Sequence, residues 1–323
     1  MTTDTLGSIG ELAVLSRIFP RLPDARAALL GPGDDAAVVA TPDGRVVITT
    51  DMMIHGPDFR LAWSTAHDLG WKAAASNLSD IAAMGAVPTA LVAALAAPAD
   101  TDVVFLEEFA DGLRDGCAAL APGCGVVGGD LSVSSTLTIA VTAFGDLEGR
   151  EPVLRSGARV GDVVAVSGVL GKAAAGLRLL FEEGVVAGAP DAAATVDLKR
   201  RHPELVAAQL APRPPIADGK AAALAGATSM LDLSDGLALD ARRVAKASGV
   251  ALDFSSEAVG SREALDGGED HSLLATFPPD ADLPGGFRRI GVVVTGVGVL
   301  VDGTPYDEAS GWDPYAGWNN AAG

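Results

Sequence analysis

The chain has 323 residues, of which 49% are hydrophobic, and this composition predicts a globular protein large enough for two domains. Its formal net charge of −19 argues against nucleic acid or an anionic membrane as a partner, and it requires cations between the protein and any phosphate ligand. There is no basic N-terminal region followed by an apolar core, and no apolar stretch of the ~20 residues that span a bilayer, so we expect a cytoplasmic protein.

The N-terminal half, residues 1–150, is expected to mix strands and helices in one domain. Ser8 to Glu11 has the spacing of a capping box and predicts an amphipathic helix. Strands predicted at 36–40 and 45–49 flank a Pro-Asp-Gly turn and should form a hairpin, followed by a loop at 52–60. The other expected elements are helices at 65–84 and from 101 or 102 to 119, and strands at 90–97, 125–127 and 137–145.

The predicted helix at 65–84 has an unusual polar face. Thr65 and Asp68 have capping-box spacing at its start, and Lys72, Ser76 and Asp80 recur every four residues, so they share one face. Lys72 is the local positive partner expected for Asp80. The many alanines between them allow close packing against a neighbour, so the polar face should point at a ligand.

The C-terminal half, residues 151–323, is expected to be a second α+β domain, with the boundary in the loop at 156–162. Residues 184–195 are rich in Gly and Ala and predict a flexible segment, and 311–323 predict a loop. Strands are expected at 163–167, 230–233, 250–254, 273–277 and 290–294, and helices at 171–181, 217–226 and 239–248.

Aspartates with small or hydroxyl-bearing neighbours recur along the chain. They are Asp34, Asp35, Asp51, Asp80, Asp130, Asp232 and Asp235. All but Asp80 lie in or at the mouth of a predicted strand, and strand ends converge on one edge of a sheet. The two cysteines and four histidines have no zinc-type spacing, so clustered carboxylates predict several Mg²⁺ or Ca²⁺ ions around a polyphosphate. Alternatively, each Asp caps a turn or a helix.

Other phosphate-binding patterns are weak. The segment at 168–173 resembles a Walker loop, but it is too short between its glycines and has Ala where the metal-binding Ser or Thr belongs. Lys172 in this segment is better explained as a solvated lysine at a helix start. The glycines at 31 and 33 imitate a dinucleotide loop, but the predicted strand follows them.

Seven motifs together identify a family resemblance. Four of them are Gly31-Pro-Gly-Asp-Asp-Ala36, Thr49-Thr-Asp51, Asn77-Leu-Ser-Asp-Ile-Ala-Ala-Met-Gly85 and Gly128-Gly-Asp130. These resemble the superfamily of aminoimidazole ribonucleotide synthetase, selenophosphate synthetase and a hydrogenase maturation factor. The others are Arg155-Ser-Gly-Ala158, Leu231-Asp-Leu-Ser-Asp-Gly-Leu237 and Gly267-Gly-Glu-Asp-His271. These resemble thiamine-monophosphate kinase, and the resemblance extends over roughly residues 10–315.

The resemblance implies a fold and an activity. The fold is two-domain α+β, like that of aminoimidazole ribonucleotide synthetase. Its N-terminal mixed sheet with helices binds ATP and Mg²⁺ and forms a barrel in a homodimer, and its C-terminal α+β domain closes over the nucleotide. The activity is Mg²⁺-dependent transfer of phosphate from ATP to thiamine monophosphate, which yields thiamine diphosphate, the last step of that biosynthesis.

The resemblance also implies site residues, carried over motif by motif. The metal positions are Asp35, Thr49, Thr50, Asp51, Asp80, Asp130, Asp232 and Asp235. The ATP positions are Gly129, Asp130, Arg155 and Ser234, and Asp80, Asp130 and Arg155 are expected to act on the transferring phosphoryl group. The substrate positions are Glu269, Trp312 or Tyr315, and Asp58, which stands where the family often has His before Phe.

The chemistry agrees with this set of residues. The nucleophile is a phosphate oxygen that is already anionic at pH 7, so no general base is needed. The difficulty is repulsion between two anions, which metal ions relieve. Two alternatives stay open: another ATP-dependent enzyme of the superfamily, or a non-catalytic divalent-metal-binding protein. The first is disfavoured because no Cys precedes the Gly-Asp-Asp loop and none ends the chain.

Overall fold

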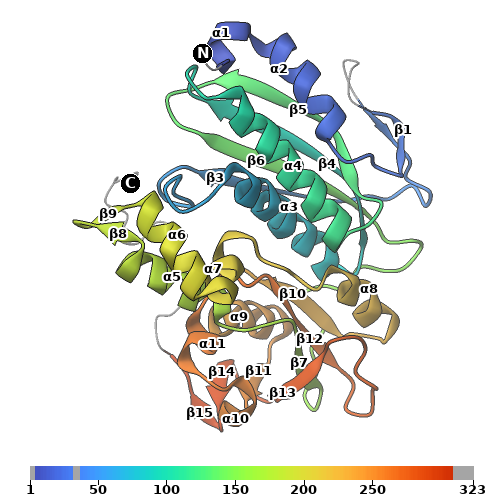
Figure 1. The fold of residues 1–323 in the computed structure, drawn as a ribbon. Helices are drawn as coiled ribbons and strands as arrows, with labels where there is room; N and C mark the ends of the chain where they lie inside the picture. The colour runs from blue at the N-terminus through green and yellow to red at the C-terminus, as the bar shows by residue number, and fades with distance from the viewer. Residues whose placement is uncertain (1–3, 32–36, 308–323) are drawn as a thin grey trace.

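The computed structural model describes residues 4–31 and 37–307 of the chain. Two sheets lie one above the other in Figure 1, the upper one built from the N-terminal half and the lower one from the C-terminal half. None of the helices in the described residues combines the length and the apolarity needed to cross a membrane. The mixed α+β architecture predicted for both halves is confirmed.

The upper sheet has the strand order β3-β6-β4-β5, in which β4 and β5 run parallel and the other pairs antiparallel. Helices α3 and α4 cover one face of this sheet in Figure 1. The elements are α1 Leu6–Ile9, α2 Glu11–Ile18, the 3-10 helix η1 Phe19–Arg21, β1 Ala28–Leu30, β2 Val38–Val39, β3 Val47–Ile54, α3 Ala66–Ala83, β4 Val87–Ala97, α4 Val103–Leu120, β5 Gly125–Val133 and β6 Thr138–Asp146.

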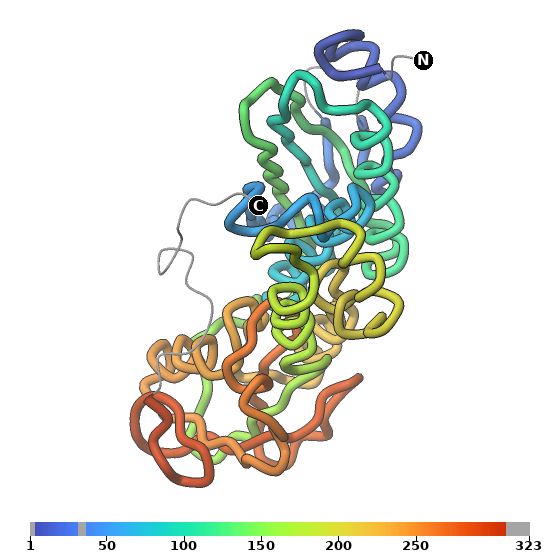
Figure 2. The backbone as a smooth tube through the Cα atoms, turned by 60° about the vertical axis from the view of Figure 1, so that its left-hand side comes forward, coloured from blue at the N-terminus to red at the C-terminus, as the bar shows by residue number. Residues whose placement is uncertain are grey.

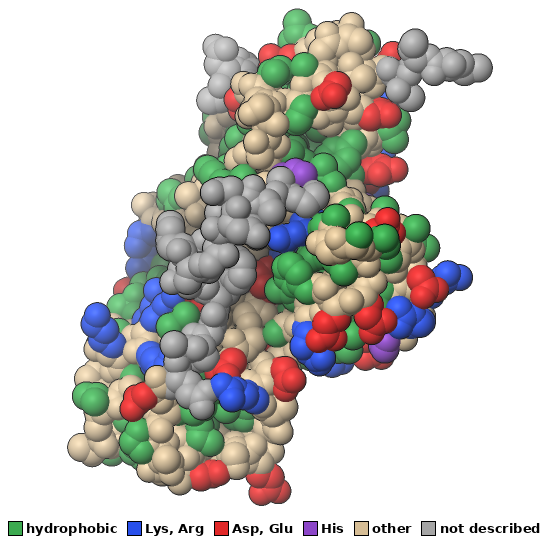
Figure 3. All heavy atoms as spheres, turned by 90° about the vertical axis from the view of Figure 1, so that its left-hand side faces the viewer, with side chains coloured by type: hydrophobic (Ala, Val, Ile, Leu, Met, Phe, Trp, Pro, Cys, Tyr) green, Lys and Arg blue, Asp and Glu red, His purple; other side chains and the backbone are tan. Residues whose placement is uncertain are grey.

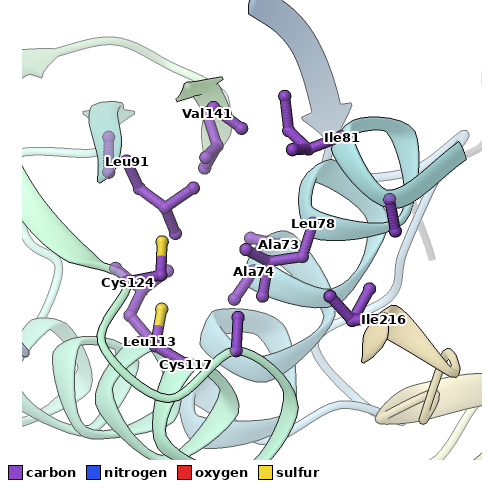
Figure 4. Packing of buried hydrophobic residues seen from close by; sticks show 14 of the residues in the cluster. Ala73, Ala74, Leu78, Ile81, Leu91, Leu113, Cys117, Cys124, Val141 and Ile216 are labelled. Atoms are coloured by element: carbon purple, nitrogen blue, oxygen red, sulfur yellow. The ribbon is translucent and has the colours of Figure 1, made fainter. Parts of the chain in front are cut away.

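Helix α3 forms as predicted, with Thr65 and Asp68 in a reciprocal capping box. It packs unusually closely on α4, because a Cβ atom added at Gly70 would lie 2.1 Å from the carbonyl oxygen of Phe109. The same holds in the other direction, where a Cβ at Gly112 would lie 2.2 Å from the His67 carbonyl oxygen. Figure 4 shows the buried side of α3 facing α4, the sheet and the start of α8. The helix that carries Asp80 is therefore held on most of its sides.

The lower sheet has the strand order β10-β12-β7-β13-β11-β14-β15, mostly antiparallel, with β11 and β14 parallel. Its elements are β7 Val163–Ser167, α5 Lys172–Glu183, β8 Val185–Val186, β9 Ala189–Pro190, α6 Ala192–Arg201, α7 Pro203–Leu210, α8 Ile216–Leu224, β10 Ser229–Leu233, α9 Leu237–Ser248, β11 Ala251–Phe254, α10 Ser256–Val259, α11 Arg262–Asp266, β12 Ser272–Phe277, β13 Arg288–Val294, β14 Gly298–Val301 and β15 Thr304–Pro305.

Hydrophobic packing joins the two halves. One apolar cluster runs from α3 and the upper sheet into one face of the lower sheet, where it includes Met230 and Phe277. A separate cluster lies on the other face of the lower sheet, under α9. The segment from α5 to α7 lies beside α3 in both Figure 1 and Figure 2. The indole nitrogens of Trp63 and Trp71 donate to the carbonyl oxygens of Gly184 and Pro212, at 2.9 and 2.7 Å.

Several predicted elements need correction. The predicted hairpin of 36–40 with 45–49 is wrong, because β2 pairs with β1, whereas β3 pairs with β6 along its whole length. The expected loop after Asp51 is strand as far as Ile54. Ser8 belongs to a capping box with Thr5 on α1, and α2 starts after Gly10, whose φ of 78° interrupts the helix. A local turn signal does not decide pairing when a distant strand offers a longer partner.

Two further corrections lie elsewhere. The short strand predicted at 125–127 continues to Val133, so Asp130 lies inside β5 and not at its mouth. The segment at 184–195, predicted to be flexible, contains the short pair β8 and β9 and the start of α6, which Asp191 caps by accepting from the amide of Ala194 at 2.7 Å. Helices α6 and α7 and strands β14 and β15 had no counterpart among the predicted elements.

Candidate active site

Strand β3 and helix α3 bring polar side chains together beneath the upper sheet. The Thr49 hydroxyl donates to Oδ2 of Asp80 at 2.7 Å, and the amide of Asp51 donates to Oδ1 of the buried Asn77 at 3.2 Å. Thr49 and Asp51 face α3 because side chains alternate along a strand. Thr50 lies on the opposite face, where its hydroxyl donates to the Val141 carbonyl oxygen at 3.0 Å. Within this chain, Thr50 is therefore separated from the carboxylates.

The carboxylates of Asp51, Asp80 and Asp232 repel one another at the junction of the two halves. Burial raises the pKa of Asp80 to about 7, and repulsion by Asp232 and then Asp51 adds to the rise. Burial likewise raises the pKa of Asp51, with further contributions from Asp232 and Glu269. Buried carboxylates of this kind are costly unless a cation or a proton neutralises them. Their chemistry therefore fits a hard divalent cation.

The described residues do not by themselves complete a metal site. In residues 4–31 and 37–307, no group of three or more His, Cys, Asp or Glu side chains is arranged to hold an ion. Mg²⁺ usually takes only one or two protein carboxylates and completes its shell with phosphate oxygens and water. The arrangement is thus suited to ions that arrive with a polyphosphate. Asp34 and Asp35 lie outside the described residues.

A cavity of about 840 Å³ opens beside these carboxylates and is lined by both halves of the chain. Asp51, Asp58 and Lys72 line it from the N-terminal half, and Ser234 and Glu269 from the C-terminal half. The Asp58 carboxylate accepts from the amide of Ile54 at 2.7 Å, and burial raises its pKa. The candidate substrate residues Asp58 and Glu269, predicted from distant motifs, thus line the same cavity.

The segment at 269–271 contacts three different parts of the molecule with three consecutive side chains. Glu269 pairs with Lys72 of α3, with 2.5 Å between Oε2 and Nζ, so Lys72 is not the partner of Asp80. Asp270 accepts from the amides of Gly171 and Ala173 at 2.5 and 2.9 Å, and so caps α5. His271 places Nδ1 3.3 Å from Oδ2 of Asp232.

Two of these residues have unusual backbone conformations. The φ angles of Glu269 and His271 are 71° and 50°, in the left-handed region that residues other than Gly rarely adopt. Each such residue costs of order 1–3 kcal/mol and persists only where the surroundings enforce it. Here the amide of Glu269 donates to the Ser234 carbonyl oxygen at 2.8 Å, and that of His271 to the Leu233 carbonyl oxygen at 3.0 Å.

The turn after β10 is held by a buried carboxylate on α9. Oδ2 of Asp240 accepts from the amides of Asp235 and Gly236 at 3.0 and 3.1 Å, and Arg243 bridges the carboxylates of Asp240 and Asp235. Burial raises the pKa of Asp240 to about 7, although the charge of Arg243 opposes the rise. This network orients Ser234 and Asp235 at the wall of the cavity.

Other predicted residues lie apart from this cluster. Gly129 and Asp130 are exposed on the edge strand β5 and line a second, mostly apolar cavity of about 560 Å³ between α2, α4 and β5. Arg155 is exposed, and its carbonyl oxygen accepts from the Ser248 hydroxyl at 3.2 Å. Trp312 and Tyr315 lie outside the described residues.

Sequence reasoning missed an aromatic wall of the large cavity. The guanidinium of Arg60 lies 4.9 Å from the ring centroid of Trp63 and 5.0 Å from that of Phe181. Figure 3 shows hydrophobic side chains gathered on the lobe that contains α5 and α6, above acidic and basic ones. Phe181 and Val196 in this lobe are exposed. No local signal pairs Phe181 with Trp63, because the contact joins distant segments.

Comparison with known proteins agrees with this architecture. Residues 33–147 match the family described as AIR synthase related protein, N-terminal domain. Over 98% of this chain and 93% of the relative, the sequence is 43% identical to thiamine-monophosphate kinase of Mycobacterium tuberculosis. The chain belongs to the thiamine-monophosphate kinase family. The resemblance inferred from the motifs is thereby confirmed.

Solved structures of this kinase family share the fold. Thiamine-monophosphate kinase from Stenotrophomonas maltophilia K279a is 31% identical, with a TM-score of 0.76 over 91% of this chain and 97% of that one. A complex of AaThiL with AMPPCP and TMP is 34% identical, with a TM-score of 0.71 over 86% of this chain and 90% of that one. The kinase-family fold therefore extends over both sheets.

Proposed function

We propose that this chain transfers a phosphoryl group from ATP to thiamine monophosphate and so forms thiamine diphosphate and ADP. The observation that carries the proposal is the 43% identity to a thiamine-monophosphate kinase over 98% of the chain. The complex of AaThiL with AMPPCP and TMP, which is 34% identical to this chain, supports the same pair of substrates. Neither of the alternatives from the sequence has a comparable observation in its favour.

On the acceptor side, the large cavity supplies Asp58 and Glu269, whose negative charges suit the cationic ring of thiamine. The phosphate oxygen that attacks is already anionic, so the site needs no residue to remove a proton. His271 agrees with this, since it is buried and its Nδ1 is directed to Asp232 and to the Ser79 hydroxyl, 3.4 Å away. The protein's task is to bring two anions together in line.

We also propose that the carboxylates hold Mg²⁺. The ligand positions expected from the resemblance are Asp35, Thr49, Thr50, Asp51, Asp80, Asp130, Asp232 and Asp235. Of these, Thr49, Asp51, Asp80 and Asp232 lie together, whereas Thr50 and Asp130 lie apart from them within one chain. Two unit charges ~4 Å apart repel by roughly 4 kcal/mol at an effective dielectric of about 20, and bound Mg²⁺ would offset that repulsion between the phosphates. The raised pKa values of Asp51 and Asp80 support the proposal, because burial and the neighbouring carboxylates outweigh the opposing charge of His271 at both groups.

For the nucleotide, we propose that the apolar cavity of about 560 Å³ takes the base of ATP. Gly129 and Asp130 at its rim are the positions expected to bind ATP, and the missing side chain at Gly129 accommodates the carbonyl oxygen of Ala93, 1.9 Å from where a Cβ would stand. The other expected ATP positions lie apart from this cavity, with Ser234 at the large cavity and Arg155 on the surface of the C-terminal half. The resemblance implies that Asp80, Asp130 and Arg155 act on the phosphoryl group in transfer, but within one chain Asp130 and Arg155 lie apart from Asp80.

The open face of the upper sheet supports a homodimer. Ile48 and Met52 of β3 point away from α3 and are 58% and 59% exposed, with Thr50 between them. Apolar side chains in a row on a sheet face are a common interface for a second copy. We propose that two upper sheets meet through this face and close into the barrel expected from the resemblance.

Two smaller proposals concern organisation and location. The chain would divide into domains at about residue 150, with residues 1–150 binding ATP and Mg²⁺ and residues 151–323 closing over them.

We propose a cytoplasmic location, because Cys117 and Cys124 are free although their side chains lie side by side in Figure 4. Neighbouring free thiols are typical of a reducing compartment.

The decisive experiment is incubation of the purified chain with ATP, Mg²⁺ and thiamine monophosphate, followed by chromatography. Thiamine diphosphate and ADP should appear in equal amounts, and chelation of the metal should stop their formation. ADP without thiamine diphosphate would contradict the proposed acceptor. Folded protein that forms neither product at any Mg²⁺ concentration would contradict the kinase activity itself.

A further inference from the structure

Lys72 and Glu269 form a shielded ion pair across the junction of the two halves. Nζ lies 2.5 Å from Oε2, and the side chains are 7% and 28% exposed. Lys72 also donates to the carbonyl oxygen of Gln209 at 3.2 Å, so its ammonium is held on two sides. Both members of the pair line the large cavity.

The pair lies among carboxylates that would otherwise repel Glu269. Asp51 and Asp58 line the same cavity, and the charge of Glu269 contributes to the raised pKa of each. Burial favours a protonated Glu269, but the charge of Lys72, followed by that of His271, outweighs it and keeps the pKa of Glu269 below its ordinary value. Lys72 therefore keeps Glu269 ionised next to two like charges.

The conformation of Glu269 makes this support specific. Its backbone is constrained at a φ of 71°, so the side chain leaves the segment in a set direction toward α3. Lys72, which pairs with Glu269 there, lies on α3, and the residues of this helix are almost all buried. A rigid helix thus supplies a fixed positive charge at the point that the carboxylate reaches.

We propose that Lys72 is a positioning residue for the acceptor substrate. It holds the carboxylate of Glu269 charged and turned toward the cavity, where that carboxylate meets the cationic ring of a phosphorylated thiamine. The inference rests on the proposed function, because it takes Glu269 as a substrate contact. It predicts that Lys72 acts on acceptor binding through Glu269 and has little effect on ATP.

The test compares Lys72→Met, Glu269→Gln and the double variant with the unchanged chain. Lys72→Met should raise the KM for thiamine monophosphate by about 10-fold or more, with the KM for ATP changed by less than about 2-fold. Because Lys72 acts through Glu269, the double variant should have the same KM for thiamine monophosphate as Glu269→Gln alone. It should also melt at a higher temperature than Lys72→Met, since it leaves no unpaired buried charge.

The matched control is Lys220→Met, which removes another ion pair between the two halves. Lys220 lies 2.6 Å from Glu148, but both side chains are 40% exposed and neither lines the cavity. This variant should leave both KM values unchanged. If it raises the KM for thiamine monophosphate as much as Lys72→Met does, the effect comes from weaker contact between the two halves of the chain, and the inference is wrong.

Other outcomes are equally decisive. An unchanged KM for thiamine monophosphate in Lys72→Met, or an equal rise in the KM for ATP, would overturn the inference while leaving the kinase activity standing. Absence of turnover in the unchanged chain would instead overturn the proposed function. If Lys72→Met does not fold, the double variant carries the test, and a KM well above that of Glu269→Gln would overturn the inference.

Discussion

The hydroxyl of Ser79 shares its hydrogen between the Ser76 carbonyl oxygen at 2.7 Å and Oδ2 of Asp232 at 3.1 Å, although Ser79 and Asp232 are 153 positions apart in the chain. Ser79 is on α3 and Asp232 is on β10, so this hydrogen bond joins the two halves. His271 approaches the same oxygen, with Nδ1 at 3.3 Å. All three side chains are buried. The orientation of Asp232 relative to Asp80, one residue after Ser79, is therefore set from both halves.

Replacing Ser79 with Ala should weaken this arrangement. The variant leaves one buried carboxylate oxygen with a single side-chain partner, and we expect a loss of about 1 kcal/mol in unfolding free energy. Turnover should fall by about 10-fold, because Asp232 is free to turn away from the proposed metal. Urea unfolding and steady-state kinetics measure both effects. Ser16→Ala, which removes an exposed hydroxyl that donates to the Ala13 carbonyl oxygen, is the control and should change neither.

Asp80→Asn should separate stability from catalysis. Without metal, the variant should be at least as stable as the unchanged chain, because it removes a buried charge that Asp232 and Asp51 repel. Turnover should fall by about 100- to 1000-fold, the usual loss for one electrostatic contact to a transition state. Added Mg²⁺ with an ATP analogue should raise the melting temperature of the unchanged chain more than that of the variant. Near-normal turnover at limiting Mg²⁺ would remove Asp80 from the proposed metal site.

The pH dependence of stability should carry the signature of Asp80. Its pKa is about 7 in the folded chain, above the ordinary value of 3.8, so between these values the folded state holds a proton that the unfolded state has lost. The stabilising contribution of Asp80 to the unfolding free energy is therefore fully present below pH 3.8 and is lost as the pH rises to 7.

Melting curves in a chelator test this sign. The melting temperature of the unchanged chain should fall relative to Asp80→Asn from pH 4 to 7 by several degrees, since 1 kcal/mol corresponds to about 2–4 °C in domains of this size. The difference should level off above pH 7. A difference that is constant with pH would mean that Asp80 titrates normally in the folded chain.

The close contact of α3 with α4 should make Gly112 intolerant of a methyl group. Gly112→Ala would place Cβ 2.2 Å from a backbone oxygen of α3, and we expect a loss of about 1–3 kcal/mol in unfolding free energy. Gly116→Ala on the same helix is the matched control, because its Cβ would lie 3.3 Å from a side-chain methyl of Ala74. Chemical denaturation should show this loss of unfolding free energy for Gly112→Ala and at most a small change for Gly116→Ala.

Substitutions that add negative charge test the proposed dimer face. Ile48→Glu combined with Met52→Glu should convert the protein to a monomer, because two like-charged rows would face each other across the interface. Light scattering coupled to size-exclusion chromatography measures the mass. Val297→Glu, at an 87% exposed position in the C-terminal half, should leave the mass unchanged. A dimer that survives the double substitution would exclude this face as the interface.

Much of the local structure followed from the sequence. Thr65 caps α3 as predicted, and Asp102, one of the two predicted starts, caps α4, because a cap is satisfied by backbone amides within the first turn of its own helix. Strand ends were less accurate: Asp51 and Asp130 lie inside β3 and β5. The Gly, Ser and Thr residues around them look like turn residues, but a distant strand pairs with their backbone.

By itself, the sequence determined the chemistry available to this protein: carboxylates in recognisable motifs, a net negative charge and a helix with a polar face. Only the tertiary structure decided which of these groups meet. It paired Lys72 with Glu269 instead of Asp80, joined Ser79 to Asp232, and set Gly129 and Asp130 at a separate cavity. The physical reason is that caps and turns depend on neighbours in the chain. Which side chains are buried, and which charged groups lie next to each other, depends instead on how distant segments pack.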